Sequence, residues 1–99
     1  MTRVELSVRA IERLDRLIVT HSLPADTHAR VERSLRVLER FPKVGREVRG
    51  RWEELRFILG PWRWLLIVYV HDEKNDRVYV LTIQDARSST AVTQLTNPR

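Results

Sequence analysis

The sequence predicts a two-layer α+β domain: an N-terminal strand, a helical hairpin, and a three-stranded antiparallel meander that completes a four-stranded sheet. Three observations favour this fold. Residues 3–8 alternate apolar and polar side chains, residues 10–41 repeat apolar side chains at helical spacing, and residues 50–87 hold three strand-like runs separated by short turns. The chain has 99 residues, enough for one domain with a modest core, so we assign residues 1–99 to a single domain.

The first two elements follow from side-chain spacing. Apolar side chains alternate with polar ones at Val4, Leu6 and Val8, the period of a half-buried strand. A helix should follow, because the apolar stripe then changes to helical spacing, and it should end near His21. Ser7 or a neighbouring residue is placed to cap its start. The stripe of this helix comprises Ala10, Leu14, Leu17, Ile18 and His21.

A second helix is expected between two proline-containing breaks. Leu23-Pro24 ends the first helix, Asp26 can cap the second, and Phe41-Pro42 stops it. Its buried stripe comprises Val31, Leu35 and Leu38. Two successive helices with a short connection predict a helical hairpin.

The remainder of the chain predicts a loop, three strands and a polar tail. Residues 43–51 carry Gly45 and Gly50 among charges and should form an exposed loop. Short turns at Gly60-Pro61 and at residues 72–76 separate the strands, so neighbouring strands should run antiparallel. The expected strands are 52–59, 63–71 and 77–84, and a short helix through Ala91 and Leu95 is possible in the tail.

Alternation along two of these strands assigns side chains to faces. In strand 63–71, Arg63 and His71 fall on the same face as Tyr69, and this is the open face if both point away from the helices. In strand 52–59, we expect Glu54 and Arg56 on the open, concave face. The opposite set, expected in the core, comprises Glu53, Leu55, Phe57 and Leu59.

Composition narrows the class of protein. The chain has no cysteine, which excludes disulfides and thiolate chemistry, and its longest apolar run, 64–70, is too short to span a bilayer. The N-terminus has no uncharged signal core, so we expect a soluble cytoplasmic protein. The net charge is +5, and all cations except Lys43 and Lys74 are arginines. Such a surface attracts RNA, DNA or an acidic protein, although arginines also enrich surface ion pairs.

Four segments together resemble the RelE/ParE superfamily of bacterial toxins from type II toxin–antitoxin systems. They are SVRAIERLDRLI after the first strand, LERFPKVGREVRG at the end of the second helix, ELRFILGPWRWLLIVY across two strands, and VYVLTIQDAR at the last strand. The resemblance covers nearly the whole chain and implies a RelE-like fold. It implies one of two activities: ribosome-dependent cleavage of messenger RNA without a metal ion, as in RelE-like toxins, or inhibition of DNA gyrase, as in ParE-like toxins. We favour the RelE-like activity, cleavage of messenger RNA on the ribosome. A further alternative is an inactive homologue that binds nucleic acid or antitoxin.

The resemblance also nominates site residues. Arg56, Arg63 and Arg87 match the basic positions of the family on the second strand, the third strand and the end of the last strand, and would form a phosphate clamp. Each could instead pair with a nearby carboxylate such as Glu53, Glu54 or Asp85.

Proton transfer needs other side chains. RelE carries lysines on the second strand and a tyrosine in a C-terminal helix, whereas this chain reads WEELR there and has no tyrosine after Tyr79. Related ribosome-dependent toxins use a glutamate and a histidine, so Glu54 is the candidate base, with His71 or Tyr69 as the donor.

The remaining predictions concern ligands and partners. Of the three tryptophans, Trp64 is expected in the core, whereas Trp52 or Trp62 could be an exposed platform on which bases stack. The histidines lack the spacing of a zinc site and no phosphate-binding glycine loop is present, so we expect no metal and no cofactor. The expected partners are a cognate antitoxin and either the ribosome with its messenger RNA or, alternatively, DNA gyrase; no membrane contact is expected.

Overall fold

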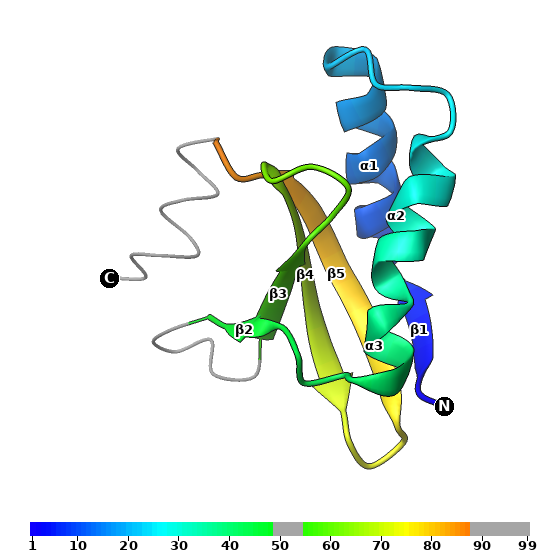
Figure 1. The fold of residues 1–99 in the computed structure, drawn as a ribbon, viewed down its shortest axis with the longest axis vertical. Helices are drawn as coiled ribbons and strands as arrows, with labels where there is room; N and C mark the ends of the chain where they lie inside the picture. The colour runs from blue at the N-terminus through cyan, green and yellow to red at the C-terminus, as the bar shows by residue number, and fades with distance from the viewer. Residues whose placement is uncertain (49–54, 88–99) are drawn as a thin grey trace.

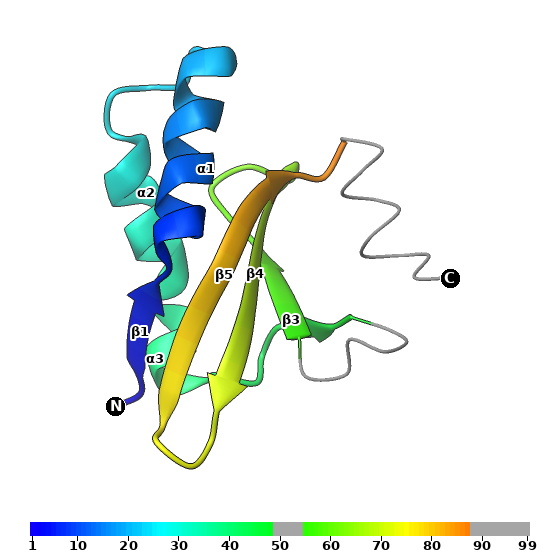
Figure 2. The same ribbon diagram turned by 180° about the vertical axis from the view of Figure 1, so that it is seen from behind.

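The computed structural model describes residues 1–48 and 55–87, which form two layers, with the helices covering one face of a single sheet (Figures 1 and 2). The Glu54 and Trp52 predictions, and the possible helix through Ala91 and Leu95, lie outside these residues. The elements are β1 (Arg3–Leu6), α1 (Val8–Thr20), α2 (Thr27–Leu35), α3 (Val37–Arg40), β2 (Arg46–Glu47), β3 (Leu55–Leu59), β4 (Leu65–Asp72) and β5 (Arg77–Asp85).

The sheet confirms the predicted fold class but has one more strand than predicted. Its order is β1-β5-β4-β3-β2, with β1 parallel to β5 and the other pairs antiparallel. The additional strand, β2, lies within the predicted loop 43–51 and pairs only Arg46 with Phe57 and Glu47 with Arg56. A two-residue edge strand is too short to show an alternating apolar pattern, so the sequence carries no signal for it.

The helical hairpin is confirmed, with one difference in its second arm. Ser7 is the N-cap of α1, and its hydroxyl accepts a hydrogen bond from the Ala10 N–H at 3.0 Å, as expected. The predicted single helix ending at Phe41 is instead two helices that meet at Arg36, where Arg36 N–H donates to Arg33 O and Glu39 N–H to Arg36 O. These i to i−3 bonds tighten the chain and interrupt the α-helical ladder.

The core lies between the helices and one face of the sheet. Its buried residues are Ala10, Leu14, Val31, Leu35, Leu38, Leu65, Ile67, Tyr69, Val78, Val80 and Ile83. The predicted apolar stripes of the helices are therefore confirmed as core at Ala10, Leu14, Val31, Leu35 and Leu38. The sequence predicts Tyr69 on the solvent-facing side of the sheet if Arg63 and His71 point away from the helices. In the structure Tyr69 lies in the core, on the side that faces the helices.

The predicted face of strand 52–59 is wrong for the described residues. Residues paired directly across antiparallel strands share a face, and Arg56 pairs with Tyr69 while Ile58 pairs with Ile67. Arg56 therefore lies on the helix-facing side, and Leu55, Phe57 and Leu59 lie on the other. Likewise, His71 pairs with Val78, a core residue, and does not lie on the open face. Alternation separates two sets of side chains, but when both sets contain apolar residues it does not say which set meets the helices.

Both ends of the sheet are well defined in Figure 1. The upper end comprises the β3–β4 turn (residues 60–64), the end of β5 with Ala86 and Arg87, the C-terminus of α1 and the beginning of α2. The lower end carries the β4–β5 hairpin at residues 73–76. Among the described residues, no helix is long and apolar enough to cross a bilayer.

Candidate functional site

Three elements distant in sequence meet at the upper end of the sheet. α1 ends at its C-cap His21, the β3–β4 turn carries Trp62 and Trp64, and β5 ends at Asp85, followed by Arg87. The Ala86 N–H donates to the Trp64 carbonyl at 2.6 Å, so the turn and the end of β5 are joined by backbone as well as by side chains. This convergence makes the upper end a candidate site.

Three rings at this end form a stack, here called the aromatic column: Trp62, Trp64 and His21. The centroids of Trp62 and Trp64 are 5.7 Å apart at an interplanar angle of 12°, and those of Trp64 and His21 are 5.0 Å apart at 14°. Both separations lie in the range of favourable stacking. Two guanidiniums flank the column: Arg87 Cζ stands 4.6 Å over the Trp64 ring, and Arg30 Cζ 6.0 Å over the Trp62 ring.

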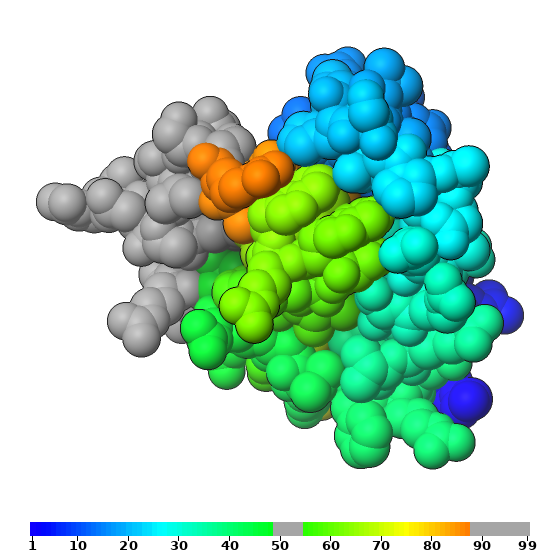
Figure 3. All heavy atoms as spheres, turned by 45° about the horizontal axis from the view of Figure 1, so that its top comes forward, coloured from blue at the N-terminus to red at the C-terminus, as the bar shows by residue number. Residues whose placement is uncertain are grey.

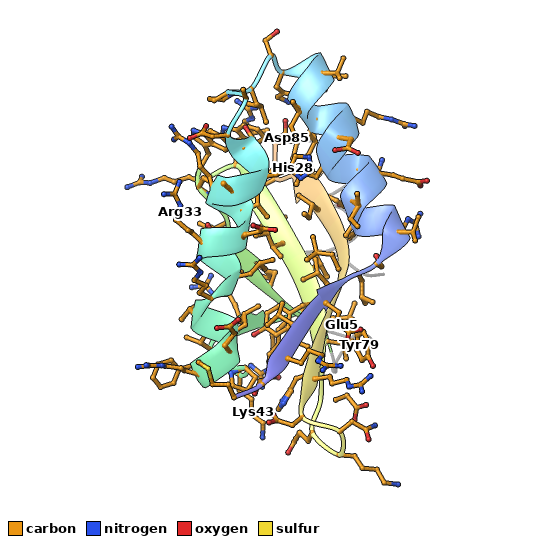
Figure 4. The ribbon with its side chains drawn as sticks, turned by 90° about the vertical axis from the view of Figure 1, so that its right-hand side faces the viewer. Glu5, His28, Arg33, Lys43, Tyr79 and Asp85 are labelled. Atoms are coloured by element: carbon orange, nitrogen blue, oxygen red, sulfur yellow. The ribbon has the colours of Figure 1, made fainter. Side chains whose placement is uncertain are left out.

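Asp85 ties the column to Arg87 (Figure 4 labels Asp85). Its carboxylate accepts from the Arg87 backbone N–H at 2.8 Å and from Nε and Nη2 at 3.1 Å each. It also accepts from His21 Nε2 at 2.9 Å, while Thr20 Oγ1 lies 2.8 Å from His21 Nδ1. Because a carboxylate only accepts, Nε2 carries the ring proton and Nδ1 can accept from the Thr20 hydroxyl. Both ring nitrogens of His21 are therefore engaged.

These hydrogen bonds set the charge state of Asp85. The Arg87 guanidinium, and to a smaller extent the Arg87 N–H and His21, hold the pKa of Asp85 well below its usual range, although partial burial acts in the opposite direction. The same contact raises the pKa of Arg87. Asp85 is thus an anion whose charge is already balanced, and its side chain is only 16% exposed.

The unfolding free energy of the Asp85→Asn variant should fall less than that of the wild type as the pH is lowered. The pKa of Asp85 is lower in the folded protein than in the unfolded chain, so its stabilising contribution is complete above the unfolded value of about 4 and is lost as the pH falls through the folded value. Urea denaturation between about pH 5 and pH 2 should show a steeper fall in unfolding free energy for the wild type than for the variant. Glu32→Gln, on the exposed face of α2, is the control and should follow the wild type. Equal slopes for wild type and Asp85→Asn would contradict the assignment.

The structure brings together two of the three predicted clamp arginines. Arg63 is exposed in the β3–β4 turn, and Arg87 is exposed directly after β5, two residues from the paired positions Leu65 and Asp85. The Arg87 side chain is 61% exposed despite its bonds to Asp85, so its guanidinium can still meet a ligand. Arg63 and Arg87 therefore share the upper end with the aromatic column.

Arg56 lies elsewhere and is occupied. It is paired with Tyr69, four residues along β4 from Leu65. Its Nη1 donates to the carbonyls of Lys43 (3.1 Å) and Gly45 (2.9 Å), and Nη2 is 3.6 Å from the Glu47 carboxylate. The expected open-face arginine is instead a brace for the segment between α3 and β2, a role that sequence spacing alone does not reveal.

Tyr69 is fully buried, and its hydroxyl is used on both sides. It donates to the Pro42 carbonyl at 2.8 Å and accepts from the Gly45 N–H at 2.9 Å. Burial raises the pKa of this hydroxyl, although the Gly45 N–H and the Arg56 charge lower it. This geometry assigns Tyr69 to the structural brace with Arg56, away from the upper end.

His71 lies near the lower end of the sheet, one residue before the end of β4. Its side chain is 10% exposed, and its Nε2 is 3.8 Å from the Asp76 carboxylate. The length of β4 separates it from Arg63 and Arg87, because each strand residue advances about 3.3 Å. Hence neither Tyr69 nor His71 joins the arginines. Glu54 lies outside the described residues, and its neighbour Leu55 pairs with Val70, next to His71.

The alternative that a clamp arginine pairs with Asp85 is confirmed for Arg87, whereas the roles of His21 and Arg30 at this site were not predicted. His21 was placed correctly at the end of the first helix, and Asp85, just beyond the predicted strand 77–84, is the last residue of β5; the two lie 64 positions apart. The only signal in the sequence was the position of these polar residues at the ends of a helix and a strand, where side chains from neighbouring elements can meet. Within residues 1–48 and 55–87, no cluster of three or more potential metal-ligating side chains is present.

The fold has close counterparts among solved structures. No protein-family model matches the chain, and no curated protein matches it. A chain of the toxin–antitoxin complex RelBE2 from Mycobacterium tuberculosis is similar at 22% identity and a TM-score of 0.63, over 85% of this chain and 96% of that one. The isolated RelE toxin of Escherichia coli is similar at 14% identity and a TM-score of 0.64, over 95% and 94%.

A third match is a chain of the complex between an E. coli RelE variant, with two arginines replaced by alanine, and a peptide of the antitoxin RelB. It has 14% identity and a TM-score of 0.66, over 99% of this chain and 97% of that one. At these identities the comparisons establish a shared fold, and the resemblance noted in the sequence is confirmed at that level.

Proposed function

From this RelE-like toxin fold, we propose that the protein is the toxin of a toxin–antitoxin pair and that it arrests translation by cutting messenger RNA on the ribosome. The observation that carries the proposal is the pairing of two exposed arginines, Arg63 and Arg87, with stacked tryptophans at one end of the sheet. Guanidiniums bind phosphate oxygens and aromatic rings stack on unpaired bases, which together suit single-stranded RNA.

Cleavage without a metal requires stabilisation of the charge that develops on the phosphate. Arg87 is suited to this task because Asp85 and the Trp64 face hold its guanidinium in place before substrate arrives. Arg63 supplies a second cation from the β3–β4 turn. The base for the 2′ hydroxyl is left unassigned, because Leu55, the residue after Glu54, pairs with Val70, five residues along β4 from Leu65 and away from the two arginines.

A second candidate function, inhibition of DNA gyrase, is favoured by one observation. Tyr69 is engaged in the brace and His71 lies near the lower end, so neither nominated proton donor stands beside the arginines. A surface that binds anions without a proton donor would serve a protein that blocks its target by binding. Both targets are cytoplasmic.

The proposed partner is an acidic or amphipathic antitoxin segment that covers the arginines of the upper end or the helical hairpin. Its support is the cationic character of the chain, with a net charge of +5, and the presence of antitoxin in two of the similar complexes. Such a segment would neutralise the charge that attracts the target.

Induction of the protein in bacteria should stop growth, and primer extension on cellular messages should show new 5′ ends within coding regions. Purified protein should leave gyrase supercoiling unchanged. Growth arrest with intact messages and blocked supercoiling would replace the nuclease by the gyrase inhibitor, and normal growth without antitoxin would contradict the toxin assignment. Co-expression of the adjacent reading frame should restore growth.

A further inference from the structure

We propose that the outer face of Trp62 binds one unpaired base of single-stranded RNA, sandwiched between the indole and the Arg30 guanidinium. This inference deepens the proposed function and rests on it for the choice of RNA. Figure 3 shows the β3–β4 turn in yellow-green at the molecular surface, with the orange end of β5 on one side and the cyan beginning of α2 on the other. The turn that carries Trp62 is therefore at the surface, and Trp62 itself is partly buried and packs against the core, so only part of its ring is open to a ligand.

The column beneath Trp62 is built to hold that ring in place. His21 is hydrogen-bonded at both nitrogens, Trp64 stacks on it, and Trp62 stacks on Trp64. The Trp64 carbonyl is also bonded to the Ala86 N–H. A ring already fixed in its bound orientation loses little conformational entropy when a ligand stacks on it, which favours binding.

A base can stack on Trp62 beside Arg30 if the Arg30 side chain moves outward. Trp64 stacks on Trp62, and the Arg30 guanidinium also stands over the Trp62 ring, with Cζ 6.0 Å from the ring centroid. A base between two parallel planes needs about 6.8 Å, twice the ~3.4 Å spacing of stacked bases. Arg30 is an exposed side chain whose contact with Asp26 lies at the surface, so it can move outward to admit a base.

The orientation of Arg30 is also prepared. Its Nε is within hydrogen-bond distance of both Asp26 carboxylate oxygens, at 3.0 and 3.1 Å, which restrains the guanidinium. Arginine planes stack on bases as well as on aromatic rings, so an indole and a guanidinium make a suitable sandwich. Arg63 and Arg87 at the same end would take the adjoining phosphates, while the charge of Asp85 is already matched by Arg87.

The test measures binding directly, with a labelled hexanucleotide RNA carrying 2′-O-methyl groups so that cleavage cannot occur. In fluorescence anisotropy with the purified 99-residue chain, Trp62→Leu should weaken binding at least about fivefold, and Trp62→Phe should weaken it less because a flat ring remains. Arg30→Ala should weaken binding more than Arg33→Ala, an equal loss of charge at an exposed position of the same helix, labelled in Figure 4. Circular dichroism checks that each variant is folded.

Inorganic polyphosphate, which has charge but no bases, separates stacking from electrostatics. Trp62→Leu should bind polyphosphate as the wild type does. No RNA binding by the wild type, unchanged RNA binding by Trp62→Leu, or an equal loss for RNA and polyphosphate would each overturn the inference. RNA binding that depends on Trp62, in a protein that leaves cellular messages uncut, would overturn the nuclease proposal and leave this inference standing.

Discussion

Replacing Arg63 by alanine and Arg87 by glutamine in the same chain should abolish growth arrest and lower RNA cleavage by about 100-fold or more, the usual cost of removing a fixed donor at a developing charge. Both side chains are exposed at the upper end of the sheet, and Arg87 is held over the Trp64 ring at 4.6 Å by its bonds to Asp85. The loss should therefore appear in activity, while circular dichroism and thermal unfolding still report a folded domain.

A matched variant distinguishes a site from a general effect of charge. Arg33→Ala with Arg40→Ala also removes two positive charges, from exposed positions on α2 and α3. Its cleavage should stay within a few-fold of the wild type. If the two double variants lose activity equally, overall charge drives binding and the clamp assignment to Arg63 and Arg87 is wrong.

Replacing Gly45 by alanine should destabilise the protein more than other substitutions in the segment between α3 and β2, by about 3 kcal/mol. A Cβ atom at Gly45 would lie 2.5 Å from Tyr69 Oη, 2.7 Å from Tyr69 Cε1 and 2.9 Å from the Phe57 carbonyl oxygen. Since one obstacle is a fully buried ring and another is backbone, neither can move aside without disturbing β3 or β4. Urea denaturation gives the change in unfolding free energy, and a cost below about 1 kcal/mol would contradict this packing.

Tyr69→Phe tests whether the hydroxyl is structural or catalytic. Removing it leaves the Gly45 N–H and the Pro42 carbonyl without their partner, which should cost about 1–3 kcal/mol. Cleavage per folded molecule should persist, because Tyr69 lies in the brace with Arg56 and not beside Arg87. Tyr79→Phe, at a partly exposed residue of β5, is the control and should change stability little. Lost cleavage with unchanged stability would return Tyr69 to a catalytic role.

The order of elements could be predicted because each one depends on nearby residues. The change from period two to helical spacing after Ser7, the prolines at 24 and 42, and the glycine before Pro61 are all local signals, and the structure places its elements accordingly. The resemblance to RelE-like toxins used the same order and spacing. The break at Arg36 and the edge strand β2 escaped prediction because a single turn of altered hydrogen bonding and a two-residue pairing leave no periodic pattern.

Which face of each strand meets the helices could not be predicted. β4 is apolar on both sides, so Tyr69 and Arg56 could be assigned to either layer until the pairing with core residues was known. The consequence for the site is large. Arg56 and Tyr69 lie on the helix-facing side and hold residues 42–45 in place by hydrogen bonds. Of the three arginines predicted to bind phosphate, only Arg63 and Arg87 remain candidates.

The sequence by itself determined the α+β fold class and the positions of Arg63, Arg87 and Trp62 at element ends, because periodicity, prolines and turns act over a few residues. Tertiary structure alone decided that His21, 64 positions from Asp85, would hold that carboxylate while stacking on Trp64. The helix hairpin must pack against the sheet before these groups can meet, and the burial of the apolar core, rather than any attraction among the polar residues themselves, drives that packing.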